Sequence, residues 1–147
     1  MSQQAPQSPS GAVVLGYRWL AALFAALVVI QAFLGTRGVF ADPDLITMHE
    51  MLANAMFLMI VVQTVLSWML YSRKAIGAAE VGINAALVLL TSAQIGLGYS
   101  TRGDSFVTTV SLHIPLGVLL MGLTCVVATM AWRVRVQPGT TGHSATS

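Results

Sequence analysis

Four long apolar runs, separated by short polar segments, divide the chain. They cover approximately residues 13–34, 45–71, 75–99 and 106–132. Each run is long enough to cross the hydrocarbon core of a bilayer, which takes about 20 helical residues. The short connectors require consecutive helices to be antiparallel, and lipid requires each segment to satisfy its own backbone hydrogen bonds. The pattern therefore predicts an all-α membrane protein, a bundle of four transmembrane helices.

Composition agrees with a membrane setting. Hydrophobic residues make up 56% of the 147 residues and charged residues only 8%, with a mean hydropathy of +0.78. A soluble domain carries about 25% charged residues, so we expect the lipid bilayer to be the main partner. The seven basic residues are scattered, which argues against nucleic-acid binding. We expect a disordered leader over 1–11, the bundle over 12–135 and a disordered tail over 136–147.

The first apolar run is not typical of a cleaved signal peptide. Residues 1–11 contain no Lys or Arg, and the run exceeds the usual length of such a signal. Positive charge also predicts an orientation, because cytoplasmic loops are enriched in Lys and Arg. One side of the predicted bundle carries Arg18, Arg73, Lys74, Arg133 and Arg135. The other two loops contain one basic residue each, so we expect a multi-pass protein of a bacterial cell membrane with cytoplasmic termini.

The first and second halves of the bundle share a motif. Residues 31–38 read QAFLGTRG and residues 94–103 read QIGLGYSTRG. His49 follows the first arginine by twelve residues, and His113 follows the second by eleven. The residues three and four positions past each histidine are Leu52 and Ala53, then Leu116 and Gly117. This order predicts two duplicated helical hairpins related by a pseudo-twofold axis along the membrane normal.

The duplicated histidines are the candidate chemistry of this bundle. Both are expected about 7–12 Å below the outer surface, at similar depth. Imidazole is an axial ligand of heme iron, and helices of a bundle can hold the ring between two such ligands. We therefore predict a heme b held by His49 and His113. Ala53 and Gly117, one turn beyond, would give the macrocycle room.

Further residues fit the same hypothesis. Arg37 and Arg102 could each bind one heme propionate, since arginine holds a carboxylate with two hydrogen bonds. Either arginine could instead cap a helix or anchor in headgroups. Gly38 and Gly103 would allow a tight turn after each helix. Gln31 and Gln94 are expected to form hydrogen bonds across the pseudo-axis or beside the cofactor.

Other readings of the polar residues stay open. Each histidine could simply bind a neighbouring helix, and zinc or copper is a weaker alternative because tetrahedral zinc needs four ligands. A proton relay would involve Glu50, and Met48 or Met51 could replace one histidine as a ligand. Away from this site, we expect an ion pair between Arg18 and Glu80 and a buried Cys125. Interhelical hydrogen bonds are expected from Asn54, Gln63 and Asn84.

With these residues identified, the chain resembles one four-helix half of the heme A synthase family. The shared features are a histidine on the second and fourth helices and the motif from Gln31 to Arg37. The resemblance implies a heme on the outer side with His49 and His113 as ligands. The family's catalytic half places a Glu one turn before the first of these histidines, where this chain has Ile46. We therefore do not expect heme hydroxylation by this chain alone.

The function expected from these observations is electron transfer, or service as a heme-bearing partner of a membrane enzyme. Besides the bilayer, the expected partners are another membrane redox protein or a second copy of this chain. One alternative is a cofactor-free subunit or assembly factor. Another is a module that binds a quinone or a small solute. The last is disfavoured because the only acidic side chains within the apolar runs, Glu50 and Glu80, lie near helix ends.

Overall fold

The computed structural model describes residues 10–101 and 106–135. Within them lie four helices and no strand: α1 (Gly11–Phe40), α2 (Asp44–Ser72), α3 (Ala78–Ser100) and α4 (Phe106–Arg133). The predicted all-α, four-helix fold class is confirmed. The leader and tail predicted over 1–11 and 136–147 lie outside the described residues, except for residues 10 and 11, where α1 begins.

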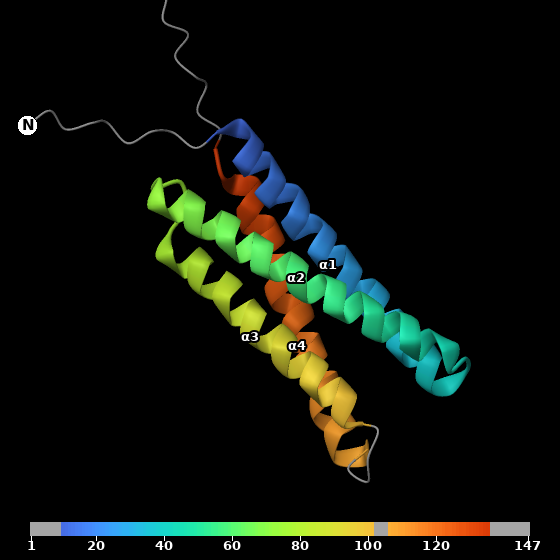
Figure 1. Cartoon of the computed structure of the whole chain (residues 1–147). Coiled ribbons are helices and arrows are strands. Elements are labelled where there is room, and N and C mark those ends of the chain that lie inside the picture. Colours follow the sequence, from blue (N-terminus) through green and yellow to red (C-terminus); the bar gives the residue numbers. More distant parts are fainter. Residues whose placement is uncertain (1–9, 102–105, 136–147) are drawn as a thin grey trace, which may run out of the picture.

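The helices form a ring in chain order. Each helix packs against the next one along the chain, and α1 closes the ring by packing against α4. Consequently α2 and α4 lie diagonally across the bundle in the part of the chain that the structure describes. Figure 1 shows that the α1–α2 hairpin and the α3–α4 hairpin approach each other at one end and diverge toward the other. We call these the terminal end, where α1 begins and α4 ends, and the histidine end, where α1 passes into α2.

All four helices are long and apolar enough to cross a membrane, with 23–30 residues each. Their outer surfaces are also apolar, as lipid contact requires. Large hydrophobic side chains such as Phe40, Leu89 and Val107 are more than 70% exposed on the isolated chain. A lipid bilayer is the environment that these surfaces fit.

The fully buried core lies toward the terminal end. Tyr17, Phe24, Ile60, Leu87 and Val127 are each no more than 1% exposed. Residues that face inward near the histidine end are different, since His49, Leu52, His113 and Leu116 are only half-buried. These four side chains are therefore less completely covered by protein than the core at the terminal end.

A buried polar network joins three helices near the terminal end. The Tyr17 hydroxyl donates to Oε1 of Glu80 at 2.9 Å. The Asn84 amide donates to the Tyr17 hydroxyl at 2.9 Å and accepts a hydrogen bond from Gln63 Nε2 at 2.8 Å. The predicted interhelical hydrogen bonds of Gln63 and Asn84 are confirmed. The network ties α1, α2 and α3 together, because each donor belongs to a different helix from its acceptor.

The ion pair predicted between Arg18 and Glu80 is wrong. Arg18 donates to the backbone carbonyls of Ala131, at 3.3 Å, and of Val134. Its guanidinium also lies over the Trp132 ring, 5.7 Å from the centroid. The last carbonyls of a helix lack intrahelical partners, so the end of α4 offers this arginine several acceptors that the sequence pattern does not display.

Removing the central amide of the network should destabilise the fold. Asn84→Leu leaves the Tyr17 hydroxyl without its donor and Gln63 Nε2 without its acceptor, in the buried interior. We expect a loss of about 1–2 kcal/mol in the free energy of unfolding, measured by circular dichroism during SDS titration of detergent micelles. Ser92→Ala on the same helix is the control, because Ser92 is exposed and bonds only within α3. Equal stability of both variants would contradict the assigned role.

The segment Thr36-Arg37-Gly38, predicted as a loop, belongs to helix α1, which continues to Phe40. Gly38 is buried, and its φ angle is not positive, so it forms no tight turn. A Cβ at Gly38 would lie 2.6 Å from Cδ1 of Ile46. This glycine is therefore required for the close approach of α1 and α2. Gly103 lies outside the described residues.

Candidate functional site

The two histidines face each other across the bundle. His49 lies five residues after the start of α2, and His113 lies seven residues after the start of α4. Their ring centroids are 6.3 Å apart, and the ring planes are inclined by 59°. Because α2 and α4 lie on the diagonal, the rings approach from opposite sides of the interior. The sequence alone could not establish this diagonal arrangement.

A glutamine holds the backbone of each histidine in the same way. Gln31 Nε2 on α1 donates to the carbonyl of His49 at 2.9 Å. Gln94 Nε2 on α3 donates to the carbonyl of His113, also at 2.9 Å. Each bond stays within one hairpin and does not cross the pseudo-axis. The two glutamines therefore have the same structural role: each binds the histidine-bearing helix of its hairpin to the neighbouring helix.

The glycine that ends each Gln-x-x-Leu-Gly motif gives space to a histidine ring. A Cβ at Gly35 would lie 3.1 Å from Cε1 and 3.3 Å from Nδ1 of His49. A Cβ at Gly98 would lie 3.5 Å from Cε1 of His113. The spacing of Gln and Gly by four residues places both on one face of the helix, toward the same histidine. Sequence reasoning quoted this motif but did not identify the role of its glycines.

The His49 ring has a defined orientation. Its Nδ1 lies 3.0 Å from the backbone carbonyl of Gln31, which can only accept, so Nδ1 carries the hydrogen. In the neutral imidazole, Nε2 is then the nitrogen with a free lone pair, which is the atom that can bind a metal. Hydrogen bonding of the far ring nitrogen is typical of metal-ligating histidines because it fixes the tautomer and raises ligand basicity.

The spacing of the rings fits one metal ion between them. Two imidazole nitrogens that bind a metal from opposite sides at about 2.0–2.1 Å each place their ring centroids about 6 Å apart. The observed separation is 6.3 Å. In the residues that the structure describes, no group of three or more His, Cys, Asp and Glu side chains could hold an ion. Two protein ligands are few for zinc but complete the coordination of heme iron, because the porphyrin supplies four nitrogens.

The remaining predicted site residues vary in their placement. Ala53 and Gly117 are both half-buried one turn beyond the histidines. A Cβ at Gly117 would lie 3.0 Å from Gln94 Nε2, so this glycine makes room for the glutamine amide. Arg37 is exposed in the last turn of α1, and Arg102 lies outside the described residues.

A contact between α2 and α3 near the histidine end was only partly anticipated. Asn54 Nδ2 donates to the hydroxyl of Tyr99 at 2.9 Å and to the backbone carbonyl of Glu50 at 3.0 Å. The interhelical hydrogen bond predicted for Asn54 is confirmed. Tyr99 was missed, although it lies one residue past the Gln-x-x-Leu-Gly motif of α3.

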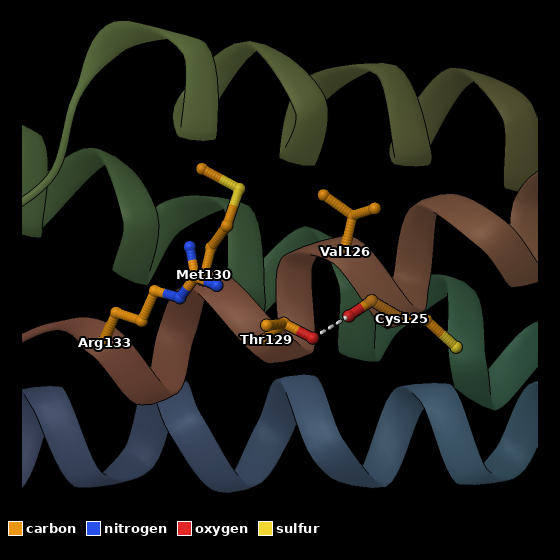
Figure 2. Close-up of a pocket in the computed structure, with 5 residues that line it drawn as sticks. All are labelled: Cys125, Val126, Thr129, Met130 and Arg133. Atoms are coloured by element: carbon orange, nitrogen blue, oxygen red, sulfur yellow. Dashed lines mark hydrogen bonds between the residues drawn. The ribbon is translucent and has the colours of Figure 1, made fainter.

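Surface depressions lie elsewhere and carry no comparable chemistry. Figure 2 shows one along α4, lined by Cys125, Val126, Thr129, Met130 and Arg133. The Thr129 hydroxyl donates to the Cys125 carbonyl at 2.8 Å. Cys125 follows His113 by twelve residues, or about 18 Å along the helix, so this depression is separate from the histidines. The burial predicted for Cys125 is wrong, because the side chain is exposed.

Comparison with protein-family models, with curated proteins and with solved structures gave no match.

Proposed function

We propose that this chain is an integral membrane heme b protein in which His49 and His113 are the two axial ligands of the iron. The observation that carries the proposal is the 6.3 Å separation of two imidazole rings that face each other from diagonal helices. When bound, the heme would supply one-electron redox chemistry. Electron transfer, or service as a heme-bearing partner of another membrane redox protein, is the function that such a centre supports best.

Several observations support heme as the ligand. The two histidines are only half-buried, and the hairpins that carry them diverge toward this end (Figure 1), which suits a flat macrocycle between them. The Nδ1 of His49 is bound by a carbonyl, which leaves Nε2 for the iron. The likeness to one half of the heme A synthase family rests on the same two histidines. Arg37, in the last turn of α1, would bind a propionate at the surface, and Arg102 is proposed for the other.

The charge distribution supports an orientation for the proposed protein. Arg18, Lys74 and Arg133 lie at the terminal end, in α1, the α2–α3 connection and the last turn of α4. By the positive-inside rule this end faces the cytoplasm. The proposed heme then lies toward the outer side of a bacterial cell membrane, where its electron partner would have to dock.

An optical spectrum tests the proposal directly. The protein is purified in detergent from heme-replete cells and measured before and after reduction with dithionite. We expect an intense Soret band and, on reduction, sharp α and β bands, with the pyridine complex of the extracted cofactor identifying heme b. Colourless protein with a native helical circular dichroism spectrum would contradict the proposal.

The same spectrum tests a second candidate function, that of a cofactor-free membrane subunit. This candidate is favoured by the fact that each histidine is already held by protein groups, the glutamine amide and the glycine of its own hairpin. It predicts a colourless protein whose His49 and His113 variants lose association with a partner without any spectral change.

A further inference from the structure

We propose that His113 is the exchangeable ligand and His49 the fixed one, so that the reduced protein binds a small neutral diatomic molecule on the His113 side. This inference deepens the proposed heme function and rests on it. If the heme is bound, the entering molecule would replace His113 Nε2 as the ligand on that side, so that one bond to the iron would break and one would form. No electron or proton is transferred in that step.

The first asymmetry concerns the far nitrogen of each ring. His49 Nδ1 lies 3.0 Å from the Gln31 carbonyl. His113 Nδ1 is buried and has no hydrogen-bond partner among the described residues. The matching backbone of Gln94 is close enough to interact with His113 but lies outside hydrogen-bond geometry. Since this hydrogen bond raises ligand basicity and fixes the ring, His113 is the weaker and less oriented ligand.

The second asymmetry concerns the glycine against each ring. Three atoms of the His49 ring lie within 3.7 Å of a Cβ placed on Gly35, the nearest at 3.1 Å. At Gly98 only one atom of the His113 ring lies within 4 Å, at 3.5 Å. The His49 ring therefore packs more tightly against α1 than the His113 ring packs against α3.

The third asymmetry is Pro115, two residues past His113 and inside α4. Proline has no N–H, so the Ser111 carbonyl loses its helical partner, and the proline ring presses on that turn. His113 lies between these two residues. Met51 occupies the corresponding position after His49, and α2 has no internal proline. Only the His113 segment is loosened, which provides the backbone freedom that ligand exchange requires.

The surroundings indicate the class of ligand. The groups recorded against the two rings are backbone groups of Gln31 and Gln94 and the glycines Gly35 and Gly98, and none of them carries a charge. A desolvated anion would need a cationic partner, and these backbone groups and glycines are not cationic. A neutral diatomic ligand such as carbon monoxide has no such requirement.

Carbon monoxide is therefore the probe for the test. Dithionite-reduced wild-type protein is mixed with carbon monoxide, and the Soret shift is followed by stopped flow. We expect binding in the wild type, and binding about tenfold faster in His113→Ala, which should keep its heme with one axial ligand. Added imidazole should restore the two-ligand spectrum of His113→Ala. His49→Ala should instead lose most of its heme.

Several outcomes would overturn the inference. They are a wild-type heme inert to carbon monoxide, equal heme retention and rates in the two histidine variants, or loss of heme from His113→Ala alone. Pro115→Ala gives an independent measurement, since restoring the helical hydrogen bond should slow carbon monoxide binding. A rate that does not fall in this variant would also count against the inference. A wild-type protein without any heme would instead contradict the proposed function itself.

Discussion

Replacing His49 with alanine is expected to remove nearly all heme from the purified protein. The ring is the better held of the two, with Nδ1 donating to the Gln31 carbonyl and its Cε1 edge against Gly35. Mutating an outer-shell partner of a metal ligand typically weakens binding 10–100-fold, so loss of the ligand itself should cost at least about 100-fold. The ratio of Soret absorbance to protein absorbance, after purification from heme-supplied cells, measures this loss.

The control for His49→Ala is Met48→Ala. Met48 is the preceding residue of α2, is 55% exposed and points away from the interior. Its replacement should leave the heme content unchanged, although Met48 was an alternative ligand in the sequence analysis. A His49→Ala protein with a wild-type spectrum, or a Met48→Ala protein without heme, would show that the assigned ligand is wrong. Both variants should keep their helical circular dichroism, because His49 contributes no fully buried apolar surface.

The sequence predicted the number of helices because lipid imposes a simple rule on each of them. A span must be apolar and about 20 residues long, and all four runs satisfy that rule. It also predicted the pairing of His49 with His113, because the duplication implied equivalent positions in two hairpins. Whether the two imidazole rings face each other depends on how the four helices are arranged around the bundle. Short connectors allow more than one such arrangement, so the sequence could not decide this.

Helix ends were predicted less well than helix centres. The apolar run ends at Leu34, yet α1 continues for six more residues to Phe40. Polar residues such as Thr36 and Arg37 end an apolar pattern without ending a helix, since their side chains can reach headgroups and water. Gly38 was read as a turn, but its role depends on the neighbouring Ile46 side chain, which no local pattern reveals.

The partners of polar residues were the least predictable part of the site. Gln31 and Gln94 were recognised as a repeated pair, yet their acceptors are backbone carbonyls, which every residue has. Glu80 was assigned a cation but binds the hydroxyl of Tyr17. A buried polar side chain forms a hydrogen bond with a donor or acceptor that lies within reach. Which group lies within reach depends on how the helices pack, and formal charge alone does not predict it.

Replacing Gly35, the glycine of the Gln-x-x-Leu-Gly motif in α1, with valine should displace the His49 ring and reduce heme binding. A Cβ at residue 35 would lie 3.1 Å from Cε1 and 3.3 Å from Nδ1 of His49, and valine adds two methyl groups to that position. Either the His49 ring must rotate so that it no longer points at His113, or α1 must move away from α2. Both changes should reduce heme content at least about tenfold, as measured by Soret absorbance per protein.

Two control variants and the helix propensity of valine separate this steric effect from a general loss of stability. Gly96→Val lies in α3, where a Cβ meets nothing within 4 Å, so its heme content should be normal. Gly98→Ala makes only an ordinary contact of 3.5 Å with His113 and should also be tolerated. Valine favours a helix slightly more than glycine does, so helix propensity cannot explain a loss in Gly35→Val. Wild-type heme content in Gly35→Val would mean that the close contact between this glycine and His49 does not position the ligand.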